Sequence, residues 1–186
     1  MKVYIHGLYA KPQKRSMPQN RPIEGLINAQ LPQLTSETPI LIQAGTGAGK
    51  TTAVLESVIP FALERGLTVW FVSSRAAIST QFRHKLLTKL GVRTIRARFT
   101  PDDLRIYEDI GPVRVITFHR LWNLINSAPE EVRSVGILVF DEVHALALAS
   151  TFVPFTGLLT EAIPKVFHNA LRIYLSATPE PILPAL

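Results

Sequence analysis

The sequence predicts an α/β protein with a mostly parallel β-sheet and helices on both of its faces. Apolar runs of strand length alternate with helical patterns from residue 40 onward, which is typical of such a sheet. A glycine-rich loop joins the first of these runs to the first helical pattern. Hydrophobic residues make up 47% of the 186 positions and charged residues only 18%, so the chain can bury a sizeable core as one domain.

The first 39 residues differ from the rest of the chain because they are rich in proline. Closely spaced prolines exclude long helices, so we treat residues 1–39 as an N-terminal extension to a domain that covers residues 40–186. Within the extension, Lys2–Leu8 is expected to form an edge strand and Pro22–Leu31 a short helix with Pro22 in its first turn. The prolines of the extension are Pro12, Pro18, Pro22, Pro32 and Pro39.

The remaining elements are expected to alternate along the chain. The predicted strands are Ile40–Gln43, Leu67–Ser73, Thr94–Arg98, Val113–Thr117, Gly136–Phe140 and Leu171–Leu175. The predicted helices are Lys50–Arg65, Ala76–Leu90, Pro101–Ile110, Phe118–Ser127 and a longer, interrupted stretch over Val143–Asn169. Ligands of parallel sheets bind at the carboxyl ends of the strands, and nearly all the chemically suggestive residues of this chain follow a predicted strand.

Charge and composition restrict the possible partners and compartment. The net charge of +6, from 20 Lys and Arg against 14 Asp and Glu, favours a polyanionic partner, although each basic cluster taken alone could be an ordinary solvated face. The absence of cysteine excludes disulfides and thiolate zinc sites. No apolar run approaches the roughly 18 residues of a membrane span, and the first residues lack the apolar core of a signal peptide. We therefore expect a cytoplasmic or nucleic-acid-associated protein that is not secreted and has no membrane partner.

The glycine-rich loop is interpreted as a phosphate-binding loop. Its glycines allow a tight turn in which successive backbone N–H groups point inward at an anion, and the dipole of the following helix favours the same ligand. Lys50 would reach the β- and γ-phosphates, and the Thr51 hydroxyl would bind the accompanying Mg²⁺. The predicted nucleotide-binding residues are Ala44, Gly45, Thr46, Gly47, Ala48, Gly49, Lys50, Thr51 and Thr52.

A second candidate site follows the apolar strand Gly136–Phe140, which ends in Asp141 and Glu142. Two carboxylates at the end of a buried strand are costly unless a cation or a reaction uses them. Asp141 would hold the Mg²⁺ through its water shell, and Glu142 would orient and deprotonate the water that attacks the γ-phosphate. We accordingly predict Lys50, Asp141 and Glu142 as catalytic. His144 fits no ordinary zinc site, because the chain has no cysteine and no histidine at ligand spacing from it.

Taken together, these motifs resemble those of superfamily 2 helicases. Ala44–Thr51 is similar to motif I, Ala-x-x-Gly-x-Gly-Lys-Thr, which also explains the alanine at its first position. Asp141–His144 resembles motif II in its DExH form, and Ser176–Thr178 resembles motif III. The resemblance covers about residues 20–180. It implies a RecA-like P-loop NTPase fold, the N-terminal ATP-binding domain of a helicase, which binds ATP and Mg²⁺ and grips one strand of nucleic acid, either RNA or DNA, by its backbone.

The resemblance also implies roles for residues outside the two candidate sites. The segment Phe71–Ser79 is similar to motif Ia, so Arg75, with Ser74 beside it, would contact nucleic-acid phosphates. Thr117 stands where a later motif of the family touches the same backbone. The residues that would couple the γ-phosphate to strand grip are His144, Ser176 and Thr178.

The sequence departs from the family pattern in two places. Arg21–Glu24 resembles the segment in which many members read adenine with a glutamine, but position 24 is Glu, and Gln30 and Gln33 lie nearby at a less familiar spacing. The chain also stops at Leu186, shortly after motif III. The family's second RecA-like domain, with its arginine fingers, would have to act in cis from outside these residues, so we expect the isolated chain to bind nucleotide with slow turnover at most.

Two other functions share many of these features. A double-strand translocase or remodelling motor would carry the same three motifs without separating strands. A non-catalytic, nucleotide-gated binding module for nucleic acid would need neither Lys50 nor Glu142, so the presence of both argues against it.

Overall fold

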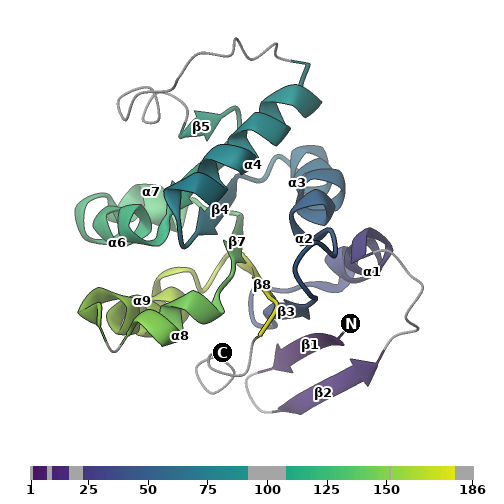
Figure 1. The fold of residues 1–186 in the computed structure, drawn as a ribbon, viewed down its shortest axis with the longest axis horizontal. Helices are drawn as coiled ribbons and strands as arrows, with labels where there is room; N and C mark the ends of the chain where they lie inside the picture. The colour runs from purple at the N-terminus through teal and green to yellow at the C-terminus, as the bar shows by residue number, and fades with distance from the viewer. Residues whose placement is uncertain (1, 8–9, 17–22, 92–107, 151, 179–186) are drawn as a thin grey trace.

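The computed structural model describes residues 2–7, 10–16, 23–91, 108–150 and 152–178, and it contains one eight-stranded sheet (Figure 1). Its strand order is β2-β1-β3-β8-β7-β4-β6-β5. The five central strands are parallel: β3 (Ile40–Gln43), β8 (Leu171–Ser176), β7 (Ile137–Asp141), β4 (Val69–Ser73) and β6 (Val113–Thr117). The outer strands are antiparallel to their neighbours: β1 (Lys2–Gly7), β2 (Ala10–Ser16) and β5 (Asp109–Ile110). The predicted α/β fold with a mostly parallel sheet is therefore confirmed.

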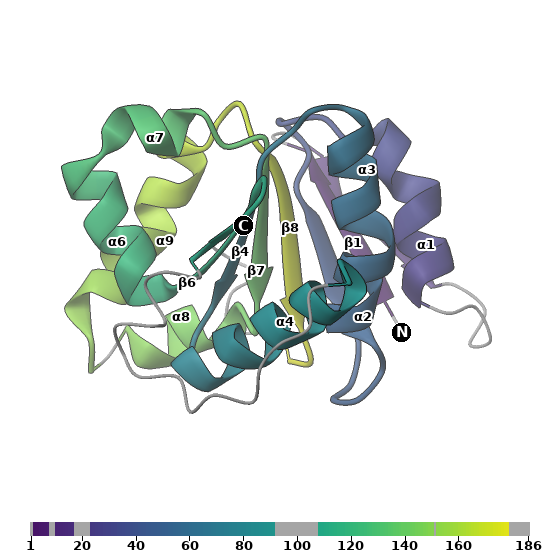
Figure 2. The ribbon, with the colours of Figure 1, turned by 90° about the horizontal axis from the view of Figure 1, so that it is seen from above.

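Helices cover both faces of the sheet (Figure 2). On one face lie α1 (Ile23–Gln30) with the short 3₁₀ helix η1 (Leu31–Gln33), the successive segments α2 (Lys50–Ala53), η2 (Val54–Val58, a π-helical turn) and α3 (Ile59–Glu64), and α4 (Ala76–Lys89). On the other face lie α6 (Phe118–Ser127), α7 (Pro129–Arg133), α8 (His144–Ala149) and α9 (Pro154–Val166).

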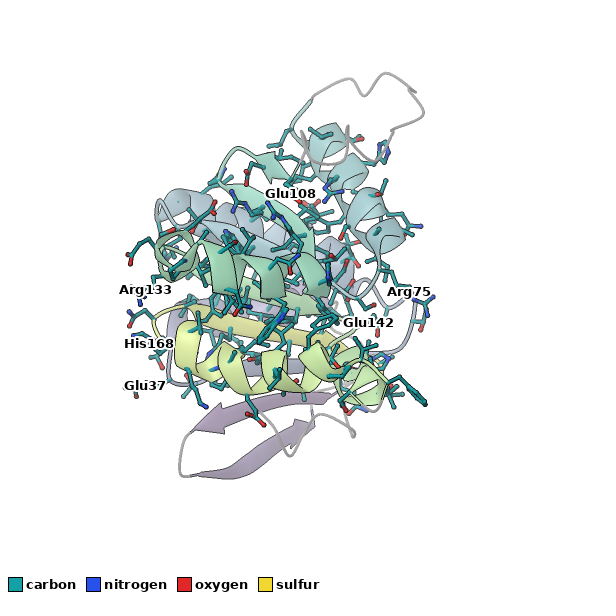
Figure 3. The ribbon with its side chains drawn as sticks, turned by 90° about the vertical axis from the view of Figure 1, so that its left-hand side faces the viewer. Glu37, Arg75, Glu108, Arg133, Glu142 and His168 are labelled. Atoms are coloured by element: carbon teal, nitrogen blue, oxygen red, sulfur yellow. The ribbon has the colours of Figure 1, made fainter. Side chains whose placement is uncertain are left out.

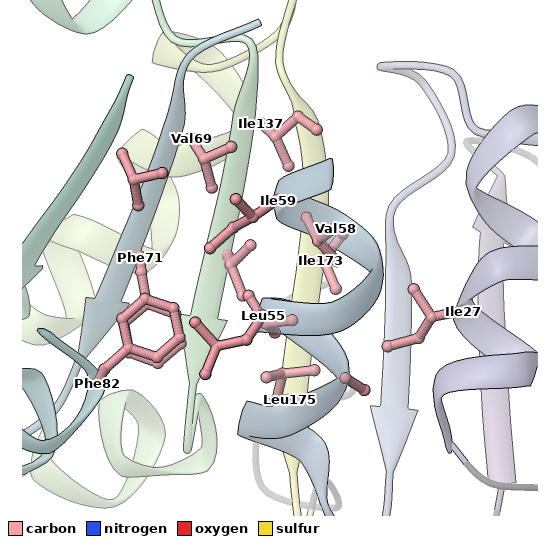
Figure 4. Packing of buried hydrophobic residues seen from close by; sticks show 14 of the residues in the cluster. Ile27, Leu55, Val58, Ile59, Val69, Phe71, Phe82, Ile137, Ile173 and Leu175 are labelled. Carbon is pink, nitrogen blue, oxygen red and sulfur yellow. The ribbon is translucent and has the colours of Figure 1, made fainter. Parts of the chain in front are cut away.

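The alternation of side chains along the buried strands creates two cores, one on each face. In β4, Phe71 belongs to the core beneath α2–α4, whereas Trp70 belongs to the core beneath α6–α9. Phe71 stacks on Phe82 of α4 with ring centroids 3.7 Å apart, and Leu55 of η2 packs in the same core (Figure 4). This packing holds η2 and α4 against the same face of the sheet.

Two expectations about the elements were wrong. Lys2–Leu8 was expected at the sheet edge, but β1 lies between β2 and β3, and β2 takes the edge. Pro12 lies in β2, and proline is tolerated in an edge strand because its missing N–H can face solvent. The predicted helix Pro101–Ile110 ends instead in β5, because residues 109–110 pair antiparallel with β6. The predicted strand Thr94–Arg98 and residues 101–107 lie outside the described residues.

The parallel register brings the predicted functional residues to one end of the sheet. Ser73 at the end of β4 is paired with Thr117 of β6 on one side and with Asp141 of β7 on the other. Gln43, the last residue before the glycine-rich loop, is paired with Ser176 of β8. Segments far apart in the sequence therefore meet at a single edge, where ligands of such sheets bind.

Candidate functional site: a phosphate loop facing two carboxylates

The glycine-rich loop forms a tight turn between β3 and α2. Gly47 and Gly49 have φ angles of 79° and 86°, in the left-handed region that other residues rarely adopt. Gly49 is the N-cap of α2, and its carbonyl accepts the first helical hydrogen bond, from Ala53 N at 2.9 Å. The Ala44 N–H donates to Ser176 O at 3.0 Å, which ties the loop to the end of β8. The sequence thus dictates both the turn and its attachment to the predicted motif III.

Lys50 is folded back over the loop that precedes it. Its side chain is only 6% exposed, and Nζ donates to Ala44 O at 2.8 Å and to Gly45 O at 3.3 Å. Glu142 Oε1 lies 3.6 Å from the same Nζ. The ammonium group is therefore held between the phosphate loop and the second carboxylate of motif II, where it can reach an anion seated in the loop.

Asp141, the last residue of β7, is a buried carboxylate. Its side chain is 4% exposed, and among the described residues its Oδ1 has no hydrogen-bond partner. Burial, and next the adjacent Glu142 carboxylate, raise the pKa of Asp141 to about 6, although the nearby Lys50 ammonium opposes the shift. Thr51 lines the same cavity as Asp141, and a carboxylate oxygen and a hydroxyl are oxygen ligands of the kind that Mg²⁺ prefers. These residues therefore fit the ion that the family implies.

Glu142 links the loop to the other predicted motifs. Its backbone has a φ of 53°, a strained value for a residue with a side chain, at the turn between β7 and α8. Its Oε2 lies 3.3 Å from His144 Nδ1, and the same nitrogen lies 2.9 Å from Ser176 Oγ. Thr178 N donates to Ser176 Oγ at 3.1 Å. A continuous polar chain thus runs from Lys50 through motif II to motif III.

A cavity of about 380 Å³ lies over the loop, and six of the nine predicted nucleotide-binding residues line it. Three residues of α4 also line it, namely Ile78, Gln81 and Lys85, and the sequence analysis missed them in this role. They recur at i, i+3 and i+7 and so share one face of α4. The complete lining is Thr46, Gly47, Gly49, Lys50, Thr51, Thr52, Ile78, Gln81, Lys85, Asp141 and Glu142.

A second cavity, a groove of about 690 Å³, adjoins the first along the same end of the sheet. The three predicted nucleic-acid contacts, Ser74, Arg75 and Thr117, all line it, as does His144. Glu142 lines both cavities. Figure 3 shows Arg75 and Glu142 at the same end of the molecule. The two predicted sites are therefore neighbours that share a carboxylate.

The residues predicted to contact a nucleic-acid backbone differ in their hydrogen bonding within the protein. Arg75 is exposed, and its extended backbone forms the N-cap position of α4. Thr117 caps α6, where its hydroxyl accepts a hydrogen bond from Arg120 N at 3.3 Å. The hydroxyl proton of Thr117 stays available to donate, because capping uses only the oxygen lone pair.

The adenine-side candidates have local roles in the structure. Gln33 Nε2 donates to Ala29 O at 3.3 Å, and Gln30 is only 7% exposed. Glu24 is exposed on α1, and its carbonyl accepts from Ser57 Oγ at 3.5 Å. Arg21 and Pro22 lie outside the described residues.

A phosphate-binding loop with its lysine, facing an Asp–Glu pair across the carboxyl ends of parallel strands, defines a P-loop domain of the RecA-like class. The chain belongs to the DEAD/DEAH box helicase family, whose model matches residues 28–183. The expected helicase resemblance is thus confirmed.

Individual proteins agree with this assignment. The chain is 30% identical over 147 residues to the ATP-dependent DNA helicase Hel308 of Pyrobaculum calidifontis, a match that covers 75% of this chain and 20% of that protein. It is 22% identical over 112 residues to the Hel308 helicase of Aeropyrum pernix, covering 58% of this chain and 15% of that one. The matches therefore span a fifth or less of these relatives' length.

Solved structures support the fold. The helicase Lhr of Mycobacterium smegmatis, bound to ssDNA and AMP-PNP, has a TM-score of 0.59 at 24% identity and covers 87% of this chain and 23% of that one. The DUF1998 helicase MrfA, bound to DNA and AMPPNP, has a TM-score of 0.58 at 14% identity and covers 95% of this chain and 29% of that one. Within the described part of this chain, every helix is too short or too polar to cross a bilayer.

Proposed function

We propose that this chain is the ATP-binding domain of a nucleic-acid-dependent ATPase of the helicase type. The observation that carries the proposal is the position of Glu142, which faces Lys50 in the phosphate cavity and His144 in the adjoining groove. One carboxylate would thereby sense both a nucleotide and a strand. The proposed partners are single-stranded nucleic acid, RNA or DNA, and a second RecA-like domain of the same protein.

Nucleotide binding would use the loop and its lysine. The backbone N–H groups of the loop and the N-terminus of α2 would hold the β-phosphate. Lys50 Nζ would exchange the carbonyls of Ala44 and Gly45 for phosphate oxygens, which are stronger partners because they are charged. Thr51 and Asp141 would hold Mg²⁺, which supplies neutralisation of the charge that develops on the phosphates.

Hydrolysis would use Glu142 as the base. Its carboxylate would accept a proton from the water that attacks the γ-phosphorus, while the bond to the β-phosphate oxygen breaks and ADP leaves. Lys50 Nζ lies 3.6 Å from Glu142 Oε1, so the carboxylate would face the phosphates bound in the cavity. Arginine fingers from the second domain would add on the order of 10³–10⁵ in rate, which is why slow turnover is proposed for this chain alone.

Coupling would run through the polar chain beyond Glu142. A change in the charge at Glu142 alters the partner that His144 Nδ1 prefers between Glu142 Oε2 and Ser176 Oγ. Ser176 Oγ in turn holds Thr178 N, at the carboxyl end of β8. Loss of the γ-phosphate would therefore be felt at Thr178, two residues beyond the end of β8.

Binding of a fluorescent ADP in the presence of Mg²⁺ tests the nucleotide site. Lys50→Ala should abolish saturable binding, whereas Lys165→Ala, at an exposed lysine in the last turn of α9, should leave it unchanged. Equal affinity of the Lys50→Ala variant and the wild type would overturn the proposal.

Hydrolysis is tested separately with a sensitive phosphate assay, with and without single-stranded RNA, single-stranded DNA and duplex. Glu142→Gln should keep Mg-ADP binding and lose whatever turnover the wild type shows. Turnover that survives in this variant would remove Glu142 from the role of base. Stimulation by duplex alone would favour a double-strand motor instead.

A further inference from the structure

We propose that the groove beside the nucleotide cavity binds an unpaired base as well as a backbone, through an aromatic platform made by His119 and Phe155. The inference rests on the proposed function. It specifies the ligand of the groove as a single strand whose unpaired bases are contacted along with its phosphates. Neither residue belongs to a motif that the sequence analysis identified.

The platform is formed by two elements on the α6–α9 face of the sheet. His119 is the second residue of α6, and Phe155 is the second residue of α9. Their ring centroids lie 5.5 Å apart with an interplanar angle of 72°, an edge-to-face pair. Both side chains line the 690 Å³ groove. Phe155 packs partly against the core, which holds its ring in place, while His119 is exposed and can contact a ligand.

The same groove is lined by the residues proposed to contact phosphate. Ser74 and Arg75 come from the turn between β4 and α4, and Thr117 comes from the end of β6. Arg75 is exposed and forms no ion pair within the described residues, so its charge is available to a ligand. One groove therefore offers a cation, hydroxyls and aromatic rings to the same ligand.

This combination fits a nucleotide unit better than it fits other ligands. A phosphate alone would not need the aromatic pair, and an apolar peptide would leave Arg75 and the hydroxyls unpaired. Every base has a π-face that can stack on an aromatic ring without regard to sequence. In a duplex those faces are covered by neighbouring base pairs, so only an unpaired strand can present one here.

A simpler account is that His119 and Phe155 touch only because α6 packs on α9. The two accounts differ in what happens when the base is removed from the ligand. If the contact is only packing, deleting bases from an oligonucleotide leaves its affinity unchanged. If the pair is a platform, base deletion weakens binding, and the weakening disappears once the platform is damaged.

The test compares two fluorescein-labelled 12-mers by anisotropy at low salt, one of oligo-dT and one with the same phosphates but abasic throughout. The wild-type chain of 186 residues should bind oligo-dT about 5- to 150-fold more tightly for each stacked base. Phe155→Leu, which keeps an apolar side chain in the core, should reduce this preference and leave abasic binding unchanged. His119→Ala should do the same at an exposed position, which covers the case in which Phe155→Leu fails to fold.

Two controls complete the design. Phe152→Ala removes an aromatic ring that is 85% exposed and does not line the groove, so it should keep the preference for bases. Arg75→Ala should weaken both oligonucleotides alike and reduce the dependence of binding on salt. Circular dichroism of each variant establishes that it is folded.

The outcomes separate the two proposals. A wild-type chain that binds both 12-mers equally, in an Arg75-dependent way, would overturn the platform and leave the proposed function standing. An undiminished preference for oligo-dT in both platform variants would also overturn it. Absence of binding to either 12-mer would overturn the proposed nucleic-acid partner, and the platform with it.

Discussion

Replacing Asp141 with asparagine should stabilise the metal-free fold, although it removes a residue proposed to bind Mg²⁺. Asp141 is 4% exposed, and its Oδ1 has no partner among the described residues. Burial and Glu142 raise its pKa from 3.8 to about 6. Each pKa unit corresponds to about 1.36 kcal/mol, so ionised Asp141 lowers the free energy of unfolding by about 3 kcal/mol.

The sign of this effect sets a clear pH window. Below about pH 4 the carboxyl is protonated in both the folded and the unfolded chain, and Asp141 has no net effect. Between about pH 4 and pH 6 the folded chain keeps a proton that the unfolded chain has lost, so stability falls as pH rises. Above about pH 6 both states are ionised and the full penalty applies. Asparagine is neutral throughout and avoids the penalty.

Urea unfolding in EDTA, followed by the fluorescence of Trp70 and Trp122, measures the difference. Asp141→Asn should exceed the wild type in free energy of unfolding by about 3 kcal/mol at pH 7.5 and match it near pH 4. Glu161→Gln, at an exposed position of α9, serves as the control and should track the wild type at every pH. A gain for Asp141→Asn that is absent at pH 7.5, or equal at pH 4 and pH 7.5, would refute the argument.

Two further predictions concern packing and the nucleotide cavity. Gly136→Ala should lower the free energy of unfolding by about 1–3 kcal/mol, because the new Cβ would lie 2.9 Å from Leu67 Cβ. Gly157→Ala is the control, because its new Cβ would meet nothing closer than 3.8 Å. Equal urea midpoints for Gly136→Ala and the wild type would contradict the prediction. Lys85→Gln should weaken binding of a Mg²⁺-bound, non-hydrolysable ATP analogue several-fold more than that of ADP, because Lys85 lines the cavity. Lys89→Gln is the control, because Lys89 Nζ lies 2.5 Å from Glu56 Oε2, and it should leave both affinities unchanged in a fluorescence titration. An equal loss of affinity for the ATP analogue and for ADP in Lys85→Gln would argue against a role at the terminal phosphate.

The sequence by itself determined the phosphate loop, the carboxylate pair and the positions of the strands that carry them. These features are local: glycine spacing, an apolar run of five residues and a switch to helical periodicity are all readable within a few positions. The loop before Lys50 and the strand before Asp141 were predicted for this reason. The placement of both at strand ends followed as well, because parallel strands share one carboxyl edge.

Only the tertiary structure decided which of these local features touch. The strand order, with β8 and β7 between β3 and β4, brings Lys50 within 3.6 Å of Glu142 and joins His144 to Ser176. The edge position of β2 and the pair formed by His119 and Phe155 likewise depend on packing between distant segments. Such contacts leave no periodic signal in the chain, since burial fixes the face on which a residue lies but not the partner across the core.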